Sequence, residues 1–180
     1  MVELAVFDLD GTLVDSDEAL IAPFVTCGVT RAAVPPLGLL LEDACAMAGI
    51  AVEDYVAAYD PTLVQAYPGV DDLLTGIERW AVCSHKLRIA GDRELERFGW
   101  RPERALFAED FGGGPKRLDL VLDGGLEPAQ LVFVGDTDHD RACARAAGVR
   151  FFLAGWNPRT EAEPDDVVLS HPLELLDHLH

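Results

Sequence analysis

The chain has 180 residues, of which 14 are basic and 32 are acidic, and its formal net charge is −18. This length predicts one domain, or one domain with a small insertion, and it suffices for a core without disulfides or a structural metal. The charge argues against nucleic acid as a partner, because the phosphate backbone would be repelled. No apolar run approaches the ~20 residues of a membrane span. We expect neither a membrane partner nor a secretion leader, and hence a cytoplasmic protein.

Short apolar runs alternate with helical patterns along most of the chain. The apolar runs are 2–7, 79–83, 105–107, 131–134, 149–153 and 167–169. There are five helical patterns. The first follows the turn Pro68-Gly69, the second covers 87–98 and ends before Gly99, the third begins at Pro115, the fourth covers 138–147 and ends before Gly148, and the fifth begins at Pro172. Near-continuous apolar runs are typical of parallel strands that are covered on both faces. The alternation therefore predicts an α/β fold with a doubly wound parallel sheet.

One segment breaks this alternation directly after the first apolar run. Residues 16–68 contain three helical stripes, within 20–25, 40–45 and 52–59, and no convincing strand. We therefore predict a small inserted all-α cap at 16–68, carried by an α/β core formed by 1–15 and 69–180.

Polar side chains follow three of the predicted strands at the point where each strand ends. Asp8, Ser84 and Asp136 occupy these positions. The carboxyl ends of parallel strands form the ligand crevice of an open α/β sheet, so we expect the three side chains to lie close together. Two of them are carboxylates, which repel each other unless a cation lies between them. An all-oxygen set of ligands favours Mg²⁺, which also accepts a substrate phosphate.

The sequence Asp8-Leu9-Asp10 sets two carboxylates just beyond the first strand, before a tight turn at Gly11-Thr12. One carboxylate of such a pair can act as a nucleophile and the other as an acid/base.

Four segments carry a family resemblance. They are FDLDGTLVDS at 7–16, VCSHK at 82–86, GPK at 114–116 and VGDTDHD at 134–140. In this order they resemble the four motifs of the haloacid dehalogenase (HAD) superfamily, in particular its phosphoglycolate phosphatase-like branch with a helical cap. The resemblance spans residues 4–153 and implies a Rossmann-like core. The first and fourth motifs are the specific ones.

The resemblance implies a role for four catalytic residues. Asp8 would be the nucleophile that forms an aspartyl-phosphate. Asp10 would protonate the leaving alcohol and then deprotonate the attacking water. Ser84 would bind the phosphoryl group by a hydrogen bond, and Lys116 would neutralise Asp8 and the phosphate.

The resemblance also implies a metal site. Asp8, Asp136 and the backbone carbonyl of Asp10 would hold Mg²⁺. Asp140, one helical turn after Asp136, would support the ligands without being one itself.

Lysine usage supports these motifs independently. The chain contains 12 arginines but only two lysines, Lys86 and Lys116, and both lie within the motifs. A compact ammonium charge on a flexible stem is not interchangeable with a guanidinium fork, so lysine at these two positions points to a specific use.

Three departures from the branch bear on the substrate. His85 follows Ser84 where relatives often have Asn, Arg117 follows Lys116 where they often have Pro, and the insertion is short. For His85 two roles stay open, contact with the substrate beside Ser84 and Lys116, or capping of the next helix. The segment Trp156-Asn157-Pro158 could line the site, but a solvent-covering loop is the more favoured interpretation.

The main hypothesis is a Mg²⁺-dependent phosphomonoester hydrolase that acts on a small phosphorylated metabolite through an aspartyl-phosphate. A sugar phosphomutase of the β-phosphoglucomutase type is one alternative, disfavoured because Arg31 is the only basic residue of the insertion. A non-catalytic binding protein on the same scaffold is the other, disfavoured because Asp8 and Lys116 are both present. Dehalogenase and phosphonatase chemistry have no use for an acid at Asp10.

Overall fold

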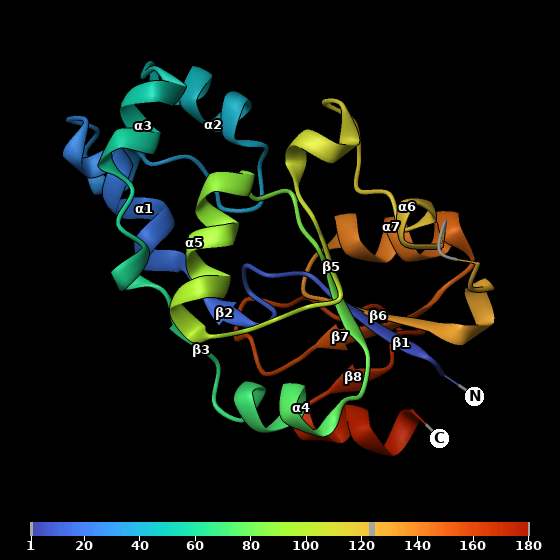
Figure 1. Ribbon diagram of the computed structural model, residues 1–180. Coiled ribbons are helices and arrows are strands. Elements are labelled where there is room, and N and C mark those ends of the chain that lie inside the picture. The colour runs from blue at the N-terminus through green and yellow to red at the C-terminus, as the bar shows by residue number, and fades with distance from the viewer. Residues whose placement is uncertain (1, 123–124, 180) are drawn as a thin grey trace. The chain divides into compact units, whose positions relative to one another are not determined.

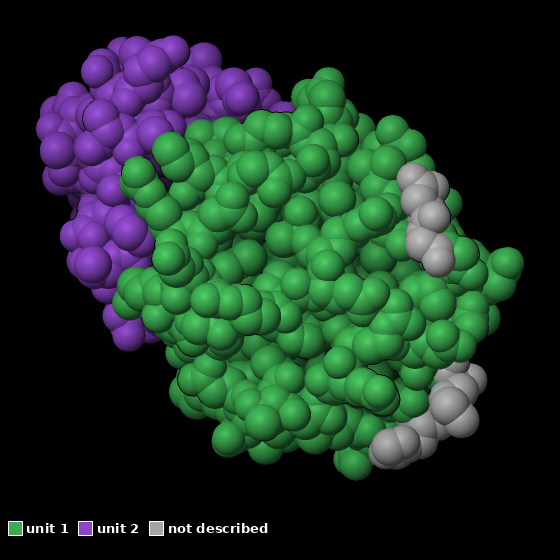
Figure 2. All heavy atoms as spheres, in the orientation of Figure 1, with its two compact units in different colours: residues 1–14, 66–180 green, residues 15–65 purple. Residues whose placement is uncertain are grey.

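The computed structural model of the protein describes residues 2–122 and 125–179. The chain divides into two compact units, which Figure 2 shows in green and purple. We call residues 1–14 and 66–180 the core unit and residues 15–65 the insert unit. Within the described part of the chain, no helix combines the length and the apolar character needed to cross a membrane.

A six-stranded sheet lies at the centre of the core unit, and every neighbouring pair of its strands is parallel (Figure 1). The strands in spatial order are β5 (Arg104–Leu106), β4 (Trp80–Cys83), β1 (Leu4–Phe7), β6 (Leu131–Gly135), β7 (Arg150–Ala154) and β8 (Val168–Leu169). β1 lies in the middle, with Val6 opposite Ala81 on one side and opposite Phe133 on the other. Every residue of β1, β4 and β6 is buried. The predicted doubly wound parallel sheet is confirmed.

Helices cover both faces of this sheet. On one face, α6 (Asp119–Leu122) and α7 (Asp138–Ala147) contribute Val121 and Cys143 to a buried cluster that also contains Val6. Successive side chains of a strand point to opposite faces. Phe152 of β7 accordingly lies on the other face, where its ring centroid is 4.9 Å from that of His178. The remaining helices of the core unit are α4 (Val70–Gly76), α5 (Arg88–Phe98) and the 3₁₀ helices η3 (Ala108–Phe111), η4 (Pro128–Gln130) and η5 (Pro172–His178).

The predicted helix ends are right at two glycines and wrong at one proline. Gly99 and Gly148 end α5 and α7 in the left-handed conformation. Pro115 does not open a helix, because α6 begins only at Asp119. Gly112, with φ of 61°, turns the chain after η3, and the residues around Pro115 then run irregularly toward the sheet.

The insert unit consists mainly of helices. They are α1 (Asp17–Thr26), α2 (Leu41–Ala48) and α3 (Val52–Ala58), with the 3₁₀ helices η1 (Arg31–Ala33) and η2 (Pro61–Leu63). Phe24, Ala44, Cys45 and Tyr55 form its buried centre. The Tyr55 hydroxyl donates a hydrogen bond of 3.0 Å to the carbonyl of Leu20, which fixes α3 against α1.

We expected no strand within 16–68, but one short strand lies there. The two-residue strands β2 (Val14–Asp15) and β3 (Gln65–Ala66) pair with each other. Here the segments that leave and re-enter the core unit run side by side, so their backbone groups bond to each other; the amide of Tyr67 also donates to the carbonyl of Leu13 at 3.1 Å. The units therefore divide after residues 14 and 65 rather than after 15 and 68. That the insert unit serves as a cap remains a prediction.

Candidate active site

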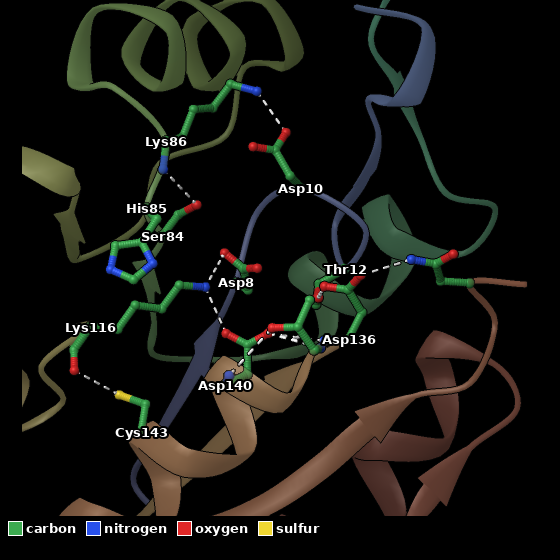
Figure 3. A network of polar contacts seen from close by, with 12 residues as sticks. Asp8, Asp10, Thr12, Ser84, His85, Lys86, Lys116, Asp136, Asp140 and Cys143 are labelled. Carbon is green, nitrogen blue, oxygen red and sulfur yellow. Dashed lines mark hydrogen bonds and ion pairs between the residues drawn. The ribbon is translucent and has the colours of Figure 1, made fainter. Parts of the chain in front are cut away.

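Asp8 follows β1 directly and forms an ion pair with Lys116 (Figure 3). The backbone amide of Asp8 donates to the carbonyl of Val134 in β6 at 2.9 Å, which holds the residue in register with the sheet. Its Oδ1 lies 2.8 Å from Nζ of Lys116. Burial raises the pKa of Asp8 to about 6, although the charge of Lys116 opposes the shift. A buried carboxylate thus lies beside a buried ammonium group at the end of the central strand.

Lys116 connects Asp8 to a second carboxylate. Its Nζ also donates to Oδ1 of Asp140 at 2.6 Å, and the Lys116 side chain is 4% exposed. Burial alone would lower the pKa of this lysine, but the carboxylates of Asp140 and Asp8 raise it above its ordinary value. Lys116 therefore stays charged near neutral pH.

Asp140 is fixed by the start of α7. Its other oxygen, Oδ2, accepts hydrogen bonds from the amide of Thr137 at 3.0 Å and from the Thr137 hydroxyl at 2.6 Å. The hydroxyl of Thr137 in turn accepts from the amide of Asp140 and completes a capping box. A side chain at Gly135 would collide with Asp140, so the glycine at the end of β6 lets this carboxylate approach the strand. Asp140 is thus the anchor of Lys116.

Asp136 follows β6, and a distant loop holds it in place. The Nδ2 group of Asn157 donates to Oδ2 of Asp136 at 2.9 Å and to the carbonyl of Gly11 at 3.0 Å. Thr12 contributes a longer hydroxyl contact of 3.4 Å to Oδ1 of Asp136. Burial, followed by the charge of Asp8, raises the pKa of Asp136 to about 8.

Three carboxylates in this region are close enough to share a cation. Asp8, Asp136 and Asp140 each offer one oxygen, these oxygens lie within 4.8 Å of one another, and all three residues are buried. Lys116 supplies one positive charge to a group that carries up to three negative charges. Burial, with a smaller contribution from the neighbouring carboxylates, raises the pKa of Asp8 and of Asp136. Hard oxygen donors with excess negative charge fit Mg²⁺.

Asp10 does not belong to that carboxylate group through its side chain. Its Oδ1 accepts a hydrogen bond of 2.6 Å from Nζ of Lys86, and the same Nζ lies 2.9 Å from Oε1 of Glu94 (the contact with Asp10 is drawn in Figure 3). Lys86 stood out in the sequence as one of two lysines but had no predicted role, and Glu94 was not among the predicted site residues. Gly91, Glu94 and Leu95 form the buried stripe of α5, so a glutamate at an apolar position was the available signal.

Ser84 and His85 lie between β4 and α5. Ser84 is 2% exposed, and its Oγ accepts a hydrogen bond of 3.3 Å from the amide of Lys86. His85 Nε2 lies 3.2 Å from the carbonyl of Gly114, and burial together with the charge of Lys116 lowers the pKa of the imidazole. The helix-capping role considered for His85 is wrong, because the imidazole contacts Gly114, and the first amide of α5, at Arg88, donates to the carboxylate of Glu109 at 3.0 Å.

The segment 156–158 is not merely a solvent-covering loop. Asn157 is 1% exposed and contacts Asp136, and the indole of Trp156 donates to the carbonyl of Thr12 at 2.9 Å. Its signal in the sequence was weaker than that of Asp8 and Asp136, because Asn157 comes four residues after the apolar run at 149–153. Every residue of the candidate site belongs to the core unit.

Comparison with known proteins finds phosphatases of similar sequence and hydrolases of similar fold. No family model matches the chain. The chain is 28% identical over 204 aligned positions to a phosphoglycolate phosphatase of Xanthomonas campestris pv. campestris, a match that covers 94% of this chain and 89% of that protein. It is 26% identical to the pyrophosphatase PpaX of Halalkalibacterium halodurans, with 98% and 96% covered. A haloacid dehalogenase-like hydrolase from Streptococcus pneumoniae shares the fold with a TM-score of 0.82 at 23% identity, covering 99% of each chain.

The six-stranded parallel sheet is the fold of the haloacid dehalogenase-like hydrolase compared above. In sequence the chain is similar to curated phosphatases, among them phosphoglycolate phosphatase.

Proposed function

We propose that the protein is a Mg²⁺-dependent phosphomonoester hydrolase that acts on a small phosphorylated metabolite through an aspartyl-phosphate on Asp8. The observation that carries the proposal is the buried ion pair between Asp8 and Lys116, 2.8 Å long, beside the carboxylate of Asp136. In a chain of net charge −18, a phosphate can approach a carboxylate only where cations neutralise both.

In the first step, an oxygen of Asp8 attacks phosphorus and the bond from phosphorus to the ester oxygen breaks. Asp10 gives its proton to the departing oxygen, which leaves as an alcohol. Lys116 and the hydroxyl of Ser84 stabilise the negative charge of the transferring group. Since phosphoryl transfer depends mainly on positioning and charge neutralisation, a fixed carboxylate suffices as the nucleophile.

In the second step, Asp10 acts as a base. It takes a proton from water as the water oxygen attacks phosphorus, and the bond between phosphorus and Asp8 breaks. The products are inorganic phosphate and the free carboxylate of Asp8, so Asp10 regains the proton it lost.

The metal site would use Asp8, Asp136 and the backbone carbonyl of Asp10, with Asp140 holding Lys116. Bound Mg²⁺ would supply charge neutralisation for the phosphate and the nucleophile.

The nature of the small substrate is a separate proposal. The relatives named above act on phosphoglycolate and on pyrophosphate. Both are small anions, which suits a site where Lys116 is the cation beside the nucleophile. His85 follows Ser84 directly, and we propose that it contacts the substrate.

The experiment is a screen of the purified protein against phosphoglycolate, pyrophosphate, sugar phosphates and 4-nitrophenyl phosphate, with Mg²⁺ and with a chelator. We expect Mg²⁺-dependent phosphate release by the wild type and none by Asp8→Asn. Asp72→Asn, at an exposed carboxylate of the core unit, is the matched control and should behave as the wild type. Conversion of a sugar 1-phosphate to its 6-phosphate without phosphate release would favour the phosphomutase, and absence of turnover on all esters would favour a binding protein.

A further inference from the structure

Lys86 and Glu94 form a buried ion pair that the proposed reaction does not use. The Lys86 side chain is 4% exposed, the Glu94 side chain is fully buried, and 2.9 Å separates Nζ from Oε1. Moving two charges out of water is costly, and a buried pair of this kind often adds no stability over apolar residues of similar size. The pair therefore calls for an explanation other than stability.

The ion pair between Lys86 and Glu94 includes a third residue, Asp10. Nζ of Lys86 also donates to Oδ1 of Asp10, a contact drawn in Figure 3, at 2.6 Å. The Asp10 side chain is 23% exposed. Asp10 is thus the member of the group that meets solvent, whereas Glu94 lies inside the core unit. The ammonium group connects a fixed interior carboxylate to the carboxylate that faces the reaction.

Two hydrogen bonds fix the backbone of Lys86. Its amide donates to Oγ of Ser84 at 3.3 Å, and its carbonyl accepts from the amide of Ala108 at 3.1 Å. Glu94 is fixed in turn by α5, which lies so close to Phe107 that a side chain at Gly91 would collide with the ring. Both ends of the lysine are therefore anchored.

The chemistry of an ammonium group makes the contact selective. Lysine has three donor hydrogens and no acceptor, so it contacts an oxygen that accepts. A protonated carboxyl oxygen is the poorer acceptor of the two, so the contact at Oδ1 leaves Oδ2 as the favoured position for the proton of a general acid. The hydrogen bond from Lys86 also restricts the rotation that would exchange the two oxygens.

We propose that Lys86, anchored by Glu94, is a positioning residue that holds Oδ1 of Asp10 and thereby directs Oδ2 to the leaving group. The inference rests on the general-acid role of Asp10 in the proposed function. Lys86 is distinct from Lys116, which neutralises Asp8.

The test compares two esters in kcat/KM, which reports the step that breaks the ester bond. An alkyl phosphate needs a proton on its leaving oxygen, whereas 4-nitrophenyl phosphate does not. We expect Lys86→Met to lower kcat/KM by about tenfold or more on the alkyl ester and by less than about threefold on the aryl ester. A merely structural role would lower both equally, and that result would overturn the proposal.

A double-mutant cycle with Asp10→Asn isolates the route of the effect. If Lys86 acts through Asp10, adding Lys86→Met to Asp10→Asn should cause no further loss on the alkyl ester. Independent losses that multiply would contradict the inference. Arg79→Met removes an exposed cation of the same unit, and it should leave the ratio of the two esters unchanged.

Two further variants test the proposal if Lys86→Met does not fold. Glu94→Gln keeps the shape of the side chain but removes the negative charge that anchors Lys86, and it should shift the ratio of kcat/KM for the two esters in the same direction as Lys86→Met. Lys86→Met combined with Glu94→Leu removes both charges, so it should fold even if the single variant does not. If this double variant keeps the wild-type ratio, the positioning role is wrong. A wild type that is active but whose Asp10→Asn variant does not discriminate between the esters would overturn the acid role of Asp10 itself, and the inference with it.

Discussion

Nζ of Lys116 lies 2.8 Å from Oδ1 of Asp8, so a residue of the third motif contacts a residue of the first. The same ammonium group contacts Asp140, from the fourth motif, at 2.6 Å. Three segments far apart in the sequence thus meet at one cation. In the proposed reaction this contact would keep a carboxylate at the end of β1 compatible with an incoming phosphate.

Replacing Lys116 by Met should reduce turnover by about 10²–10³-fold, because the transferring phosphoryl group loses a fixed positive charge. The variant should also lose about 3–5 kcal/mol of unfolding free energy, since Asp8 and Asp140 remain buried without their cation. Activity assays and urea unfolding measure the two effects. Near-wild-type kcat in a folded variant would refute the role of Lys116.

Asn157→Ala should weaken Mg²⁺ binding by about 10–100-fold, because the side chain orients Asp136 and contacts Gly11. Isothermal titration with Mg²⁺ measures the affinity directly, without turnover. Thr160→Ala, which removes a hydroxyl that donates to the backbone carbonyl of Asn157, is the control in the same loop. Equal Mg²⁺ affinity in the wild type and Asn157→Ala would show that the loop does not support the metal.

Gly11→Ala should inactivate the protein and Gly99→Ala should not. Both glycines have positive φ, 79° and 71°, so alanine costs backbone strain of about 1–2 kcal/mol at either position. Only at Gly11 would the added carbon also collide with the carboxylate of Asp136 and the amide of Asn157. Assays and thermal unfolding of both variants separate strain from collision. Equal losses of activity in Gly11→Ala and Gly99→Ala would show that the collision with Asp136 and Asn157 is not what inactivates Gly11→Ala.

The metal-free protein should become less stable as the pH rises from about 5 to about 8.5. Burial raises the pKa of Asp136 to about 8 and that of Asp8 to about 6, whereas an unfolded aspartate titrates near its ordinary value of about 4. Between these values the folded chain binds more protons than the unfolded chain, so stability present at low pH is lost as the pH rises.

Urea unfolding in a chelator at several pH values tests this dependence. Asp136→Asn should remove most of the slope, and Mg²⁺ should stabilise the wild type more at pH 8 than at pH 6. An unfolding free energy that rises over this range in the wild type, relative to Asp136→Asn, would contradict the assigned pKa shifts.

The sequence predicted the elements that local patterns encode. Apolar runs marked the strands, and the polar residues at their ends placed Asp8, Ser84 and Asp136 at one edge of the sheet. Other partners were not predictable, because 76 positions separate Lys86 from Asp10 and 21 separate Asn157 from Asp136. Such contacts depend on how α5 and the loop after β7 pack, which periodicity does not specify. The misplaced helix at Pro115 has a similar cause, since tertiary contacts of Lys116 override a local start signal.

Trapping the phosphorylated intermediate tests most directly whether Asp8 attacks phosphorus. Enzyme mixed briefly with ³²P-labelled substrate and Mg²⁺ is quenched in acid, digested and mapped by peptide. We expect an acid-stable, hydroxylamine-sensitive label on the peptide that contains Asp8, and none in Asp8→Asn. An unlabelled Asp8 peptide at every quench time, together with continued turnover by Asp8→Asn, would contradict attack by Asp8.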